Sequence, residues 1–297
     1  MRFTGLISWI AYREGIALMK MGVRIWFCMF LLAHCVPMTS CTSFTGTILY
    51  STYNAIMEFD IDTGNVTVLV EQSHYVYAMD YDYKNRFIYF PRYNSDDIVR
   101  FAYPSKNRTL QRVIQSLPYP SGIAVDSTND HIYWVAEYAE SLLRCNMDGS
   151  NEIVLSTPSY PFVIRLDLTN RWMYIVERNI GILKSRFDLT EKETIANFVS
   201  STVYCMDIDT AEQRLYWIRH DNGDMKSATF NGSDVKTILS TNSANNTYAI
   251  GVLGSNVFYA DNKQLLMVAK TPGSTPTVLY NDTSRIDSIY VFNQSGM

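Results

Sequence analysis

The chain has 297 residues, of which 47% are hydrophobic and 13% aromatic, and its formal net charge is −4. Such a composition suits a large buried core, and the length favours one large all-β domain over two ordinary domains. Residues 42–297 carry 21 basic and 28 acidic side chains, which argues against nucleic acid or anionic membranes as partners and favours a basic protein.

Residues 1–41 are interpreted as an N-terminal extension followed by a secretory signal peptide. Lys20 and Arg24 precede an apolar run at residues 25–36, and small residues follow it up to Ser43, where cleavage is expected. An uncleaved membrane anchor is the alternative, although the run is shorter than the roughly 20 residues of a spanning helix. We therefore expect a secreted, extracellular protein without a membrane span, whose folded domain is residues 42–297.

The remainder of the chain is an internal repeat. A tyrosine follows an apolar run six times, at spacings of 39, 44, 41, 42 and 43 residues: Tyr50, Tyr89, Tyr133, Tyr174, Tyr216 and Tyr259. Each copy contains short runs rich in Ile, Val, Tyr and Trp between turns rich in Asp, Asn, Gly and Ser, which is typical of β-strands. A period near 42 residues accommodates about four strands, as in one blade of a β-propeller.

The two ends of the repeat complete each other. Innermost strands are expected at residues 76–80, 122–126, 163–167, 203–207 and 249–253, but the first copy lacks one. The unpaired last run, residues 287–293, has the pattern of an innermost strand. The sequence therefore predicts an all-β, six-bladed propeller with four antiparallel strands per blade, closed by this C-terminal strand and free of exposed sheet edges.

The copies resemble the YWTD (class B) repeats of the low-density-lipoprotein-receptor family. The resemblance is carried by PSGIAVD, IYW and MDGSNEIVL in the third copy and by RLYWI and FNGSDVKTIL in the fifth. Tryptophan follows the tyrosine at Trp134 and Trp217, and the Thr-Asp pair is absent from every copy. The resemblance implies a non-catalytic propeller that captures an extracellular protein on its loop face.

Six Asn-X-Ser/Thr sequons predict N-glycosylation, several of them on expected turns. They are Asn65, Asn107, Asn231, Asn245, Asn281 and Asn293. Together with the leader they indicate a secreted glycoprotein.

Four aspartates are candidates for a calcium site at the central channel: Asp80, Asp126, Asp167 and Asp207. They are predicted to share one register after the innermost strand. That recurrence favours capping of the turn to the second strand over a catalytic or metal-binding ring. Neither a nucleophile elbow nor a His/Cys ligand set occurs in the sequence, so we expect no enzyme activity, cofactor or metal.

The loops between second and third strands share a face with the blade-to-blade loops, and they carry the predicted ligand-binding residues. Tyrosine with arginine is the composition of interface hot spots. The predicted residues are Tyr53, Arg92, Tyr93, Glu137, Tyr138, Arg178, Arg219 and His220. The blade-to-blade loops add Tyr75, Tyr119, Tyr160 and Phe162 to the same face. The alternative for any one tyrosine is packing between blades.

The expected function is therefore that of a secreted, monomeric, protein-binding propeller. Two alternatives remain open: a calcium-dependent six-bladed hydrolase of the lactonase kind, and the N-terminal fragment of a longer receptor.

Overall fold

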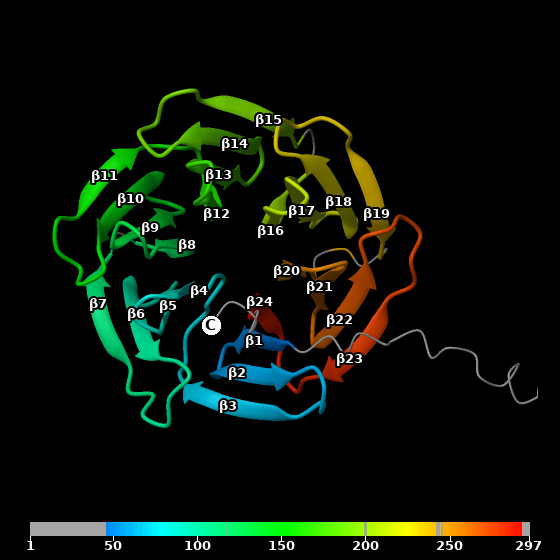
Figure 1. The fold of residues 1–297 in the computed structure, drawn as a ribbon, viewed down its shortest axis with the longest axis horizontal. Helices are drawn as coiled ribbons and strands as arrows, with labels where there is room; N and C mark the ends of the chain where they lie inside the picture. The colour runs from blue at the N-terminus through cyan, green and yellow to red at the C-terminus, as the bar shows by residue number, and fades with distance from the viewer. Residues whose placement is uncertain (1–45, 117, 199–200, 242–243, 245, 293–297) are drawn as a thin grey trace, which may run out of the picture. The chain divides into compact units, whose positions relative to one another are not determined.

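The computed structural model describes residues 46–116, 118–198, 201–241, 244 and 246–292. These residues form six separate four-stranded antiparallel sheets, arranged as blades around a central channel (Figure 1). The six-bladed propeller and its twenty-four strands are confirmed. Within these ranges no helix is long and apolar enough to cross a membrane. The predicted signal peptide and the sequons at Asn245 and Asn293 lie outside the described residues.

Each blade consists of four strands, which follow one another from the channel outward. Blade 1 is β24 (Ile286–Phe292), β1 (Thr47–Thr52), β2 (Ala55–Asp60) and β3 (Val66–Glu71). Blade 2 is β4 (Asp80–Asp82), β5 (Phe87–Arg92), β6 (Asp97–Ala102) and β7 (Gln111–Gln115). Blade 3 is β8 (Pro120–Asp126), β9 (His131–Ala136), β10 (Ser141–Asn146) and β11 (Ile153–Ser156). Blade 4 is β12 (Pro161–Asp167), β13 (Trp172–Glu177), β14 (Gly181–Arg186) and β15 (Glu193–Asn197). Blade 5 is β16 (Val203–Asp209), β17 (Arg214–Arg219), β18 (Asp224–Thr229) and β19 (Lys236–Ser240). Blade 6 is β20 (Ile250–Leu253), β21 (Asn256–Asp261), β22 (Gln264–Ala269) and β23 (Thr277–Asn281).

The ring closes as the sequence predicts, because the last strand pairs with the first. β24 runs antiparallel to β1, with Tyr290 opposite Leu49 and Ile289 opposite Tyr50. A buried hydrogen bond of 2.7 Å between the hydroxyls of Ser51 and Ser288 joins the two strands. Residues more than 230 positions apart in the sequence are thereby held in one sheet.

The innermost strand of blade 2 differs from its prediction. The sequence predicts it over residues 76–80, whereas only Asp80–Asp82 pairs with β5. The register places Pro91 of β5 at the level of Ala78, and a proline has no N–H to donate to a neighbouring strand. The carbonyl of Val76 instead accepts a hydrogen bond of 2.7 Å from the hydroxyl of Ser51 in blade 1.

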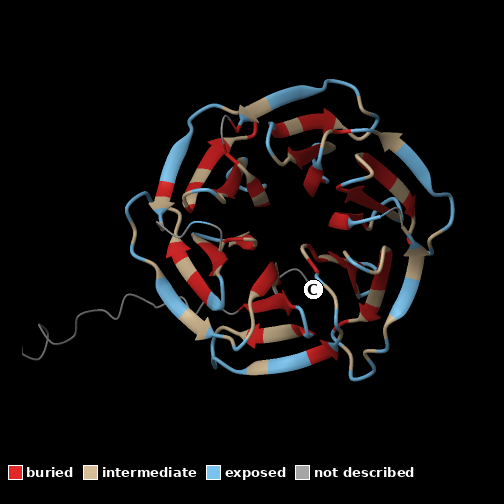
Figure 2. Cartoon of the chain, turned by 180° about the vertical axis from the view of Figure 1, so that it is seen from behind, coloured by how far each residue is buried: buried red, intermediate tan, exposed pale blue. Residues whose placement is uncertain are grey.

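The repeated tyrosines form part of the core. All six are buried, and several hydroxyls have polar partners at their tips. Tyr50 donates to Asp282 at 2.7 Å, and the Tyr89 hydroxyl accepts from Arg100 at 2.9 Å. Each of these two tyrosines thus contributes a large apolar ring with a hydrogen-bonded polar end. Burial decreases outward, so that the inner strands are buried and the outermost strand of each blade is largely exposed (Figure 2).

Two glycines explain the turn motifs of the third and fifth copies. Gly149 and Gly232 have φ of +86° and +80°, a conformation that disfavours side chains. A Cβ atom at either position would lie 2.2 Å and 2.1 Å, respectively, from the carbonyl oxygens of Val113 and Ile195 in the preceding blade. The motif therefore presses each turn against its neighbour, where only glycine fits.

Candidate protein-binding face

The propeller has two different faces. The loops between second and third strands and the connections between blades emerge on one side, which we call the loop face. The turns between first and second strands and between third and fourth strands emerge on the other, which we call the turn face. All of the predicted ligand-binding residues belong to loops of the loop face or to the strand ends beside them.

Seven tyrosine rings follow one another in contact across the loop face, and we call them the tyrosine belt. Successive ring centres are 4.9, 5.9, 5.1, 5.1, 5.0 and 6.4 Å apart along Tyr53, Tyr75, Tyr77, Tyr93, Tyr119, Tyr138 and Tyr160. Five of them are exposed, with Tyr138 the most accessible at 56%. Large aromatic side chains that remain accessible on one face are a mark of an interaction surface.

A second group of rings, called the aromatic plug, lies around the loop-face entrance of the channel. Tyr77, Phe162, Tyr204, His220 and Tyr248 have neighbouring ring centres between 4.7 and 6.1 Å apart. Tyr77 belongs to both groups and connects them. Three of these residues, Tyr77, Phe162 and Tyr204, come three positions before the innermost-strand residue that pairs with the repeated tyrosine. Tyr77, Tyr204 and Tyr248 were not among the predicted site residues, and this shared register was the signal for two of them.

Three of the predicted residues form one hydrogen-bonded group. Glu137 is 1% exposed and accepts hydrogen bonds from the Tyr93 hydroxyl, at 2.6 Å, and from the Arg178 guanidinium. Burial, together with the hydrogen bond to Glu137, raises the pKa of Tyr93 well above its ordinary value. The Arg178 guanidinium also lies 5.2 Å from the centre of the Tyr204 ring, so it links this group to the aromatic plug.

Another ion pair on the loop face involves two residues that were not predicted. Arg285 donates to Asp287 at 2.7 Å, and its guanidinium lies 4.6 Å from the ring centre of Tyr248 and 5.5 Å from that of Tyr75. Asp287 is 1% exposed, and burial raises its pKa to about 6. Its Oδ2 atom is buried without a partner among the described residues. A single arginine before the closing strand gave no repeat signal by which to find it.

The other predicted residues do not belong to the Tyr93–Glu137–Arg178 group. Arg92 and Arg219 each form an ion pair within their own hairpin, with Asp97 and Asp221. His220 packs in the aromatic plug, and burial lowers its pKa. Tyr53 and Tyr138 lie in the tyrosine belt, at one end and next to the other. The structure therefore joins Tyr93, Glu137 and Arg178 in one group and holds the two arginines at separate hairpins.

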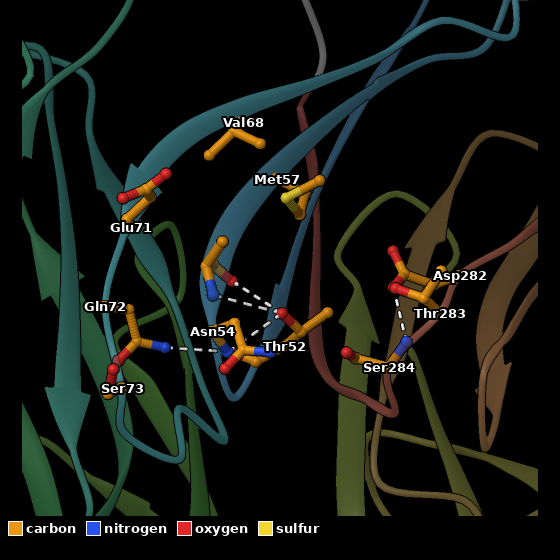
Figure 3. A pocket seen from close by; sticks show the side chains of 11 residues that line it. Thr52, Asn54, Met57, Val68, Glu71, Gln72, Ser73, Asp282, Thr283 and Ser284 are labelled. Atoms are coloured by element: carbon orange, nitrogen blue, oxygen red, sulfur yellow. Dashed lines mark hydrogen bonds between the residues drawn. The ribbon is translucent and has the colours of Figure 1, made fainter.

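A shallow pocket of about 570 Å³ lies at the rim between blades 6 and 1, beside the Tyr53 hairpin (Figure 3). Thr52 accepts hydrogen bonds from the backbone N–H groups of Asn54 and Ala55, at 3.3 and 3.2 Å. The side-chain amide of Gln72 donates to the carbonyls of Thr52 and Tyr53, at 3.0 and 3.1 Å. These bonds satisfy the hairpin locally and hold Tyr53 in position.

The four aspartates that are candidates for a channel ring do not share one register. Asp126 and Asp167 cap their turns through Asn129 and Asn170, as the turn interpretation predicts. Asp80 and Asp207 lie two positions earlier, opposite Tyr89 and Tyr216, and the equivalent capping residues are Asp82 and Asp209. The expectation of one register is therefore wrong for Asp80 and Asp207. No three His, Cys, Asp or Glu side chains in the described ranges are grouped as metal ligands would be.

The chain is similar to known proteins both in sequence and in fold. No family model matches the chain. The human low-density lipoprotein receptor-related protein 5 is 24% identical over 272 residues, which is 86% of this chain and 16% of that protein. A chain in a crystal structure of a nidogen–laminin complex superposes with a TM-score of 0.72 at 15% identity, covering 83% of this chain and 98% of the other.

The described chain is a closed six-bladed β-propeller with an aromatic loop face. The repeat pattern and the similarity to the receptor-related protein support a β-propeller of the low-density-lipoprotein-receptor YWTD type, and the likeness to the solved structure shows the same fold. The chain spans about one sixth of the length of the receptor-related protein that it resembles.

Proposed function

We propose that this chain is a secreted, N-glycosylated and non-catalytic propeller that binds an extracellular protein on its loop face. The observation that carries the proposal is the tyrosine belt, an uninterrupted series of ring contacts from Tyr53 to Tyr160 with five exposed members. Tyrosine gives a large contact area for little loss of side-chain entropy, which suits a protein interface. The resemblance to a receptor-related protein supports the same proposal of protein binding.

The polar groups around the belt indicate the chemistry of the partner. The arginines of this face are already ion-paired, with Asp97, Glu137, Asp221 and Asp287. Glu71 and Lys263 lie exposed on the same face, so the exposed charges outside these pairs include both signs. The aromatic centre therefore favours a partner with an apolar anchor and a polar rim.

The four sequons in the described ranges all have exposed asparagines: Asn65, Asn107, Asn231 and Asn281. Three of them, Asn65, Asn107 and Asn231, lie in turns between third and fourth strands, on the turn face. The hydroxyls of Thr109 and Ser233 each donate to the sequon asparagine at 2.7 Å. Glycans at these three turn-face positions would cover the turn-face rim and leave the tyrosine belt accessible.

The test is expression of the full chain in a secreting animal cell, followed by a screen against a panel of purified extracellular proteins. Binding should fall at least tenfold when Tyr119 and Tyr138 are both replaced by alanine, because exposed interface tyrosines are common hot spots. Tyr83→Ala is the matched control, since Tyr83 is 50% exposed but lies on the turn face.

Two results would overturn the proposal. One is an absence of chain from the medium, together with an absence of any mass change on enzymatic removal of N-glycans. The other is binding of partners that is equally reduced by Tyr83→Ala and by the belt variant, which would place the interface elsewhere.

A further inference from the structure

The central channel contains a cavity of about 470 Å³ that opens on the turn face. Its mouth is formed by turns between first and second strands, with Tyr83, Thr128, Thr169 and Thr210 among the lining residues. Further along the channel, the space between the aromatic plug and Arg165 measures about 10 Å³. The cavity is therefore a blind pocket with its closed end at Arg165.

Three charged side chains from three blades meet at this closed end. Arg165 donates to Asp207 at 2.9 Å. The other oxygen of Asp207 accepts the backbone N–H of Val252 at 2.8 Å. The two oxygens of Asp80 accept the backbone N–H groups of Tyr81 and Val125, at 2.8 and 2.7 Å. Because each oxygen retains a further lone pair, the carboxylates can still accept from a ligand.

The walls between the charged end and the mouth are apolar and aromatic. Met79, Leu166 and Ile208 line the cavity, and the rings of Tyr83 and Tyr290 complete it, with their hydroxyls 3.1 Å apart. Burial raises the pKa of Asp80 to about 6, although Val125 and Arg165 act in the opposite direction. A blind cavity with largely apolar walls, a few convergent polar groups and a perturbed carboxyl has the features of a small-molecule site.

We propose that this cavity binds an organic monocation, with its ammonium group against Asp80 and its apolar part along Leu166 and Ile208. Two carboxylates and one guanidinium give the closed end a net charge of −1, which a single positive charge neutralises. An anion would meet both carboxylates, and an uncharged ligand would desolvate Asp80 without compensation. The aromatic walls add favourable contacts for a cation.

The proposal does not depend on protein binding at the loop face, and its test is separate. The full secreted chain is titrated with n-hexylamine at pH 7.5, using calorimetry or ligand-observed NMR, with n-hexanol and n-hexanoate as probes of the same length. We expect saturable one-to-one binding of the amine, and binding of the alcohol and the carboxylate that is at least tenfold weaker.

Variants locate the binding. Asp80→Asn should weaken amine binding about tenfold or more, since it removes a charge-assisted hydrogen bond. Thr169→Trp fills the mouth from an exposed turn residue and should also abolish binding, even if Asp80→Asn perturbs the fold. Asp62→Asn makes the same charge change at an exposed site away from the channel and should leave binding unchanged.

The dependence on pH is a further check. Asp80 is faced by Arg165 of β12, Asp207 of β16, Tyr290 of β24 and Tyr83 of the turn after β4. Arg165 and the amine stay charged between pH 7.5 and 5.5, so amine affinity should fall as Asp80 gains its proton. Failure of the wild type to bind hexylamine, equal binding of hexanol, or unchanged binding in both channel variants would each overturn the proposal.

Discussion

The hydroxyl of Tyr93 donates a 2.6 Å hydrogen bond to Glu137, a carboxylate from the neighbouring blade that is 1% exposed. Arg178, from the next blade again, donates to the other oxygen of the same carboxylate. Three consecutive blades are therefore joined beneath the tyrosine belt by one buried charge. The Glu137 carboxylate and its two donors therefore hold these three loops of the loop face in fixed positions relative to one another.

Replacing Glu137 by alanine should lower the free energy of unfolding by about 3 kcal/mol, because it leaves the Arg178 guanidinium buried beside rings without its counter-charge. Tyr93→Phe removes one hydrogen bond and should cost about 1 kcal/mol. Urea unfolding measures both. Glu71→Ala, at an exposed rim position, is the control and should change stability little. A Glu137 variant as stable as the control would contradict this account.

Alanine substitutions at four glycines with positive φ distinguish the cost of backbone strain from the cost of a steric clash with the neighbouring blade. Gly64 and Gly273 have φ of +70° and +81° with open space where a side chain would lie, whereas Gly149 and Gly232 face backbone oxygens of the preceding blade. Alanine should cost about 1 kcal/mol at the first pair, from strain alone. At the second pair the cost should be about 3 kcal/mol or more, because two blades must separate. Equal losses at all four positions would remove the packing explanation.

Tyrosines of the belt and of the core should respond differently to truncation. Tyr133 is 1% exposed, so Tyr133→Ala should destabilise the domain by about 3 to 5 kcal/mol through loss of a buried ring. Tyr138 is 56% exposed, and Tyr138→Ala should stay within about 0.5 kcal/mol of the wild type. Thermal and urea unfolding of the two variants, measured in parallel with the wild type, give the two stability losses to be compared. A large loss at Tyr138 would mean that the belt serves packing more than binding.

The buried Asp287 should make the domain less stable as the pH rises through the acid range. Its folded pKa of about 6 lies above the ordinary value of 3.8, since burial outweighs the favourable charge of Arg285. The folded state therefore binds the proton more tightly, and the stability that this contributes below pH 4 is lost as the pH rises to about 6.

The comparison with Asp287→Asn isolates this effect, because asparagine cannot ionise. The free energy of unfolding of the variant, relative to the wild type, should rise by roughly 2 kcal/mol between pH 4 and pH 7. Urea unfolding at both pH values measures the difference. A relative stability that stays constant, or that falls with pH, would show that Asp287 ionises normally in the folded protein.

The number of blades was predictable because it depends on a repeated tyrosine, which stays recognisable when the rest of each copy varies. The register of the innermost strands at Asp80 and Asp207 was not predictable. The segments around Asp80 and Asp207 each contain a second aspartate two residues later, at Asp82 and Asp209. A shift of two residues leaves the same side chains on the same face of a strand, so alternation cannot distinguish the two registers. Only the pairing with β5 and β17 distinguishes them.

Only part of the candidate site was predictable from the sequence. Loop residues such as Tyr53 and Tyr138 stand out because aromatic side chains are unusual in turns. Tyr77 precedes β4 and Tyr204 lies within β16, so both have the pattern of core side chains, although the structure places them at the channel entrance. The grouping of Tyr93 with Glu137 and Arg178 joins three blades, and contacts between blades leave no periodic trace in one sequence.

The pairing of β24 with β1 has a consequence for how the chain can fold as it is made. The first blade to leave the ribosome lacks its channel strand, which is made after every other strand of the ring. Until residues 286–292 emerge, β1 presents an open edge that could pair with another chain. Synthesis of the last strand is therefore the step that converts five finished blades and an incomplete one into a single cooperative body.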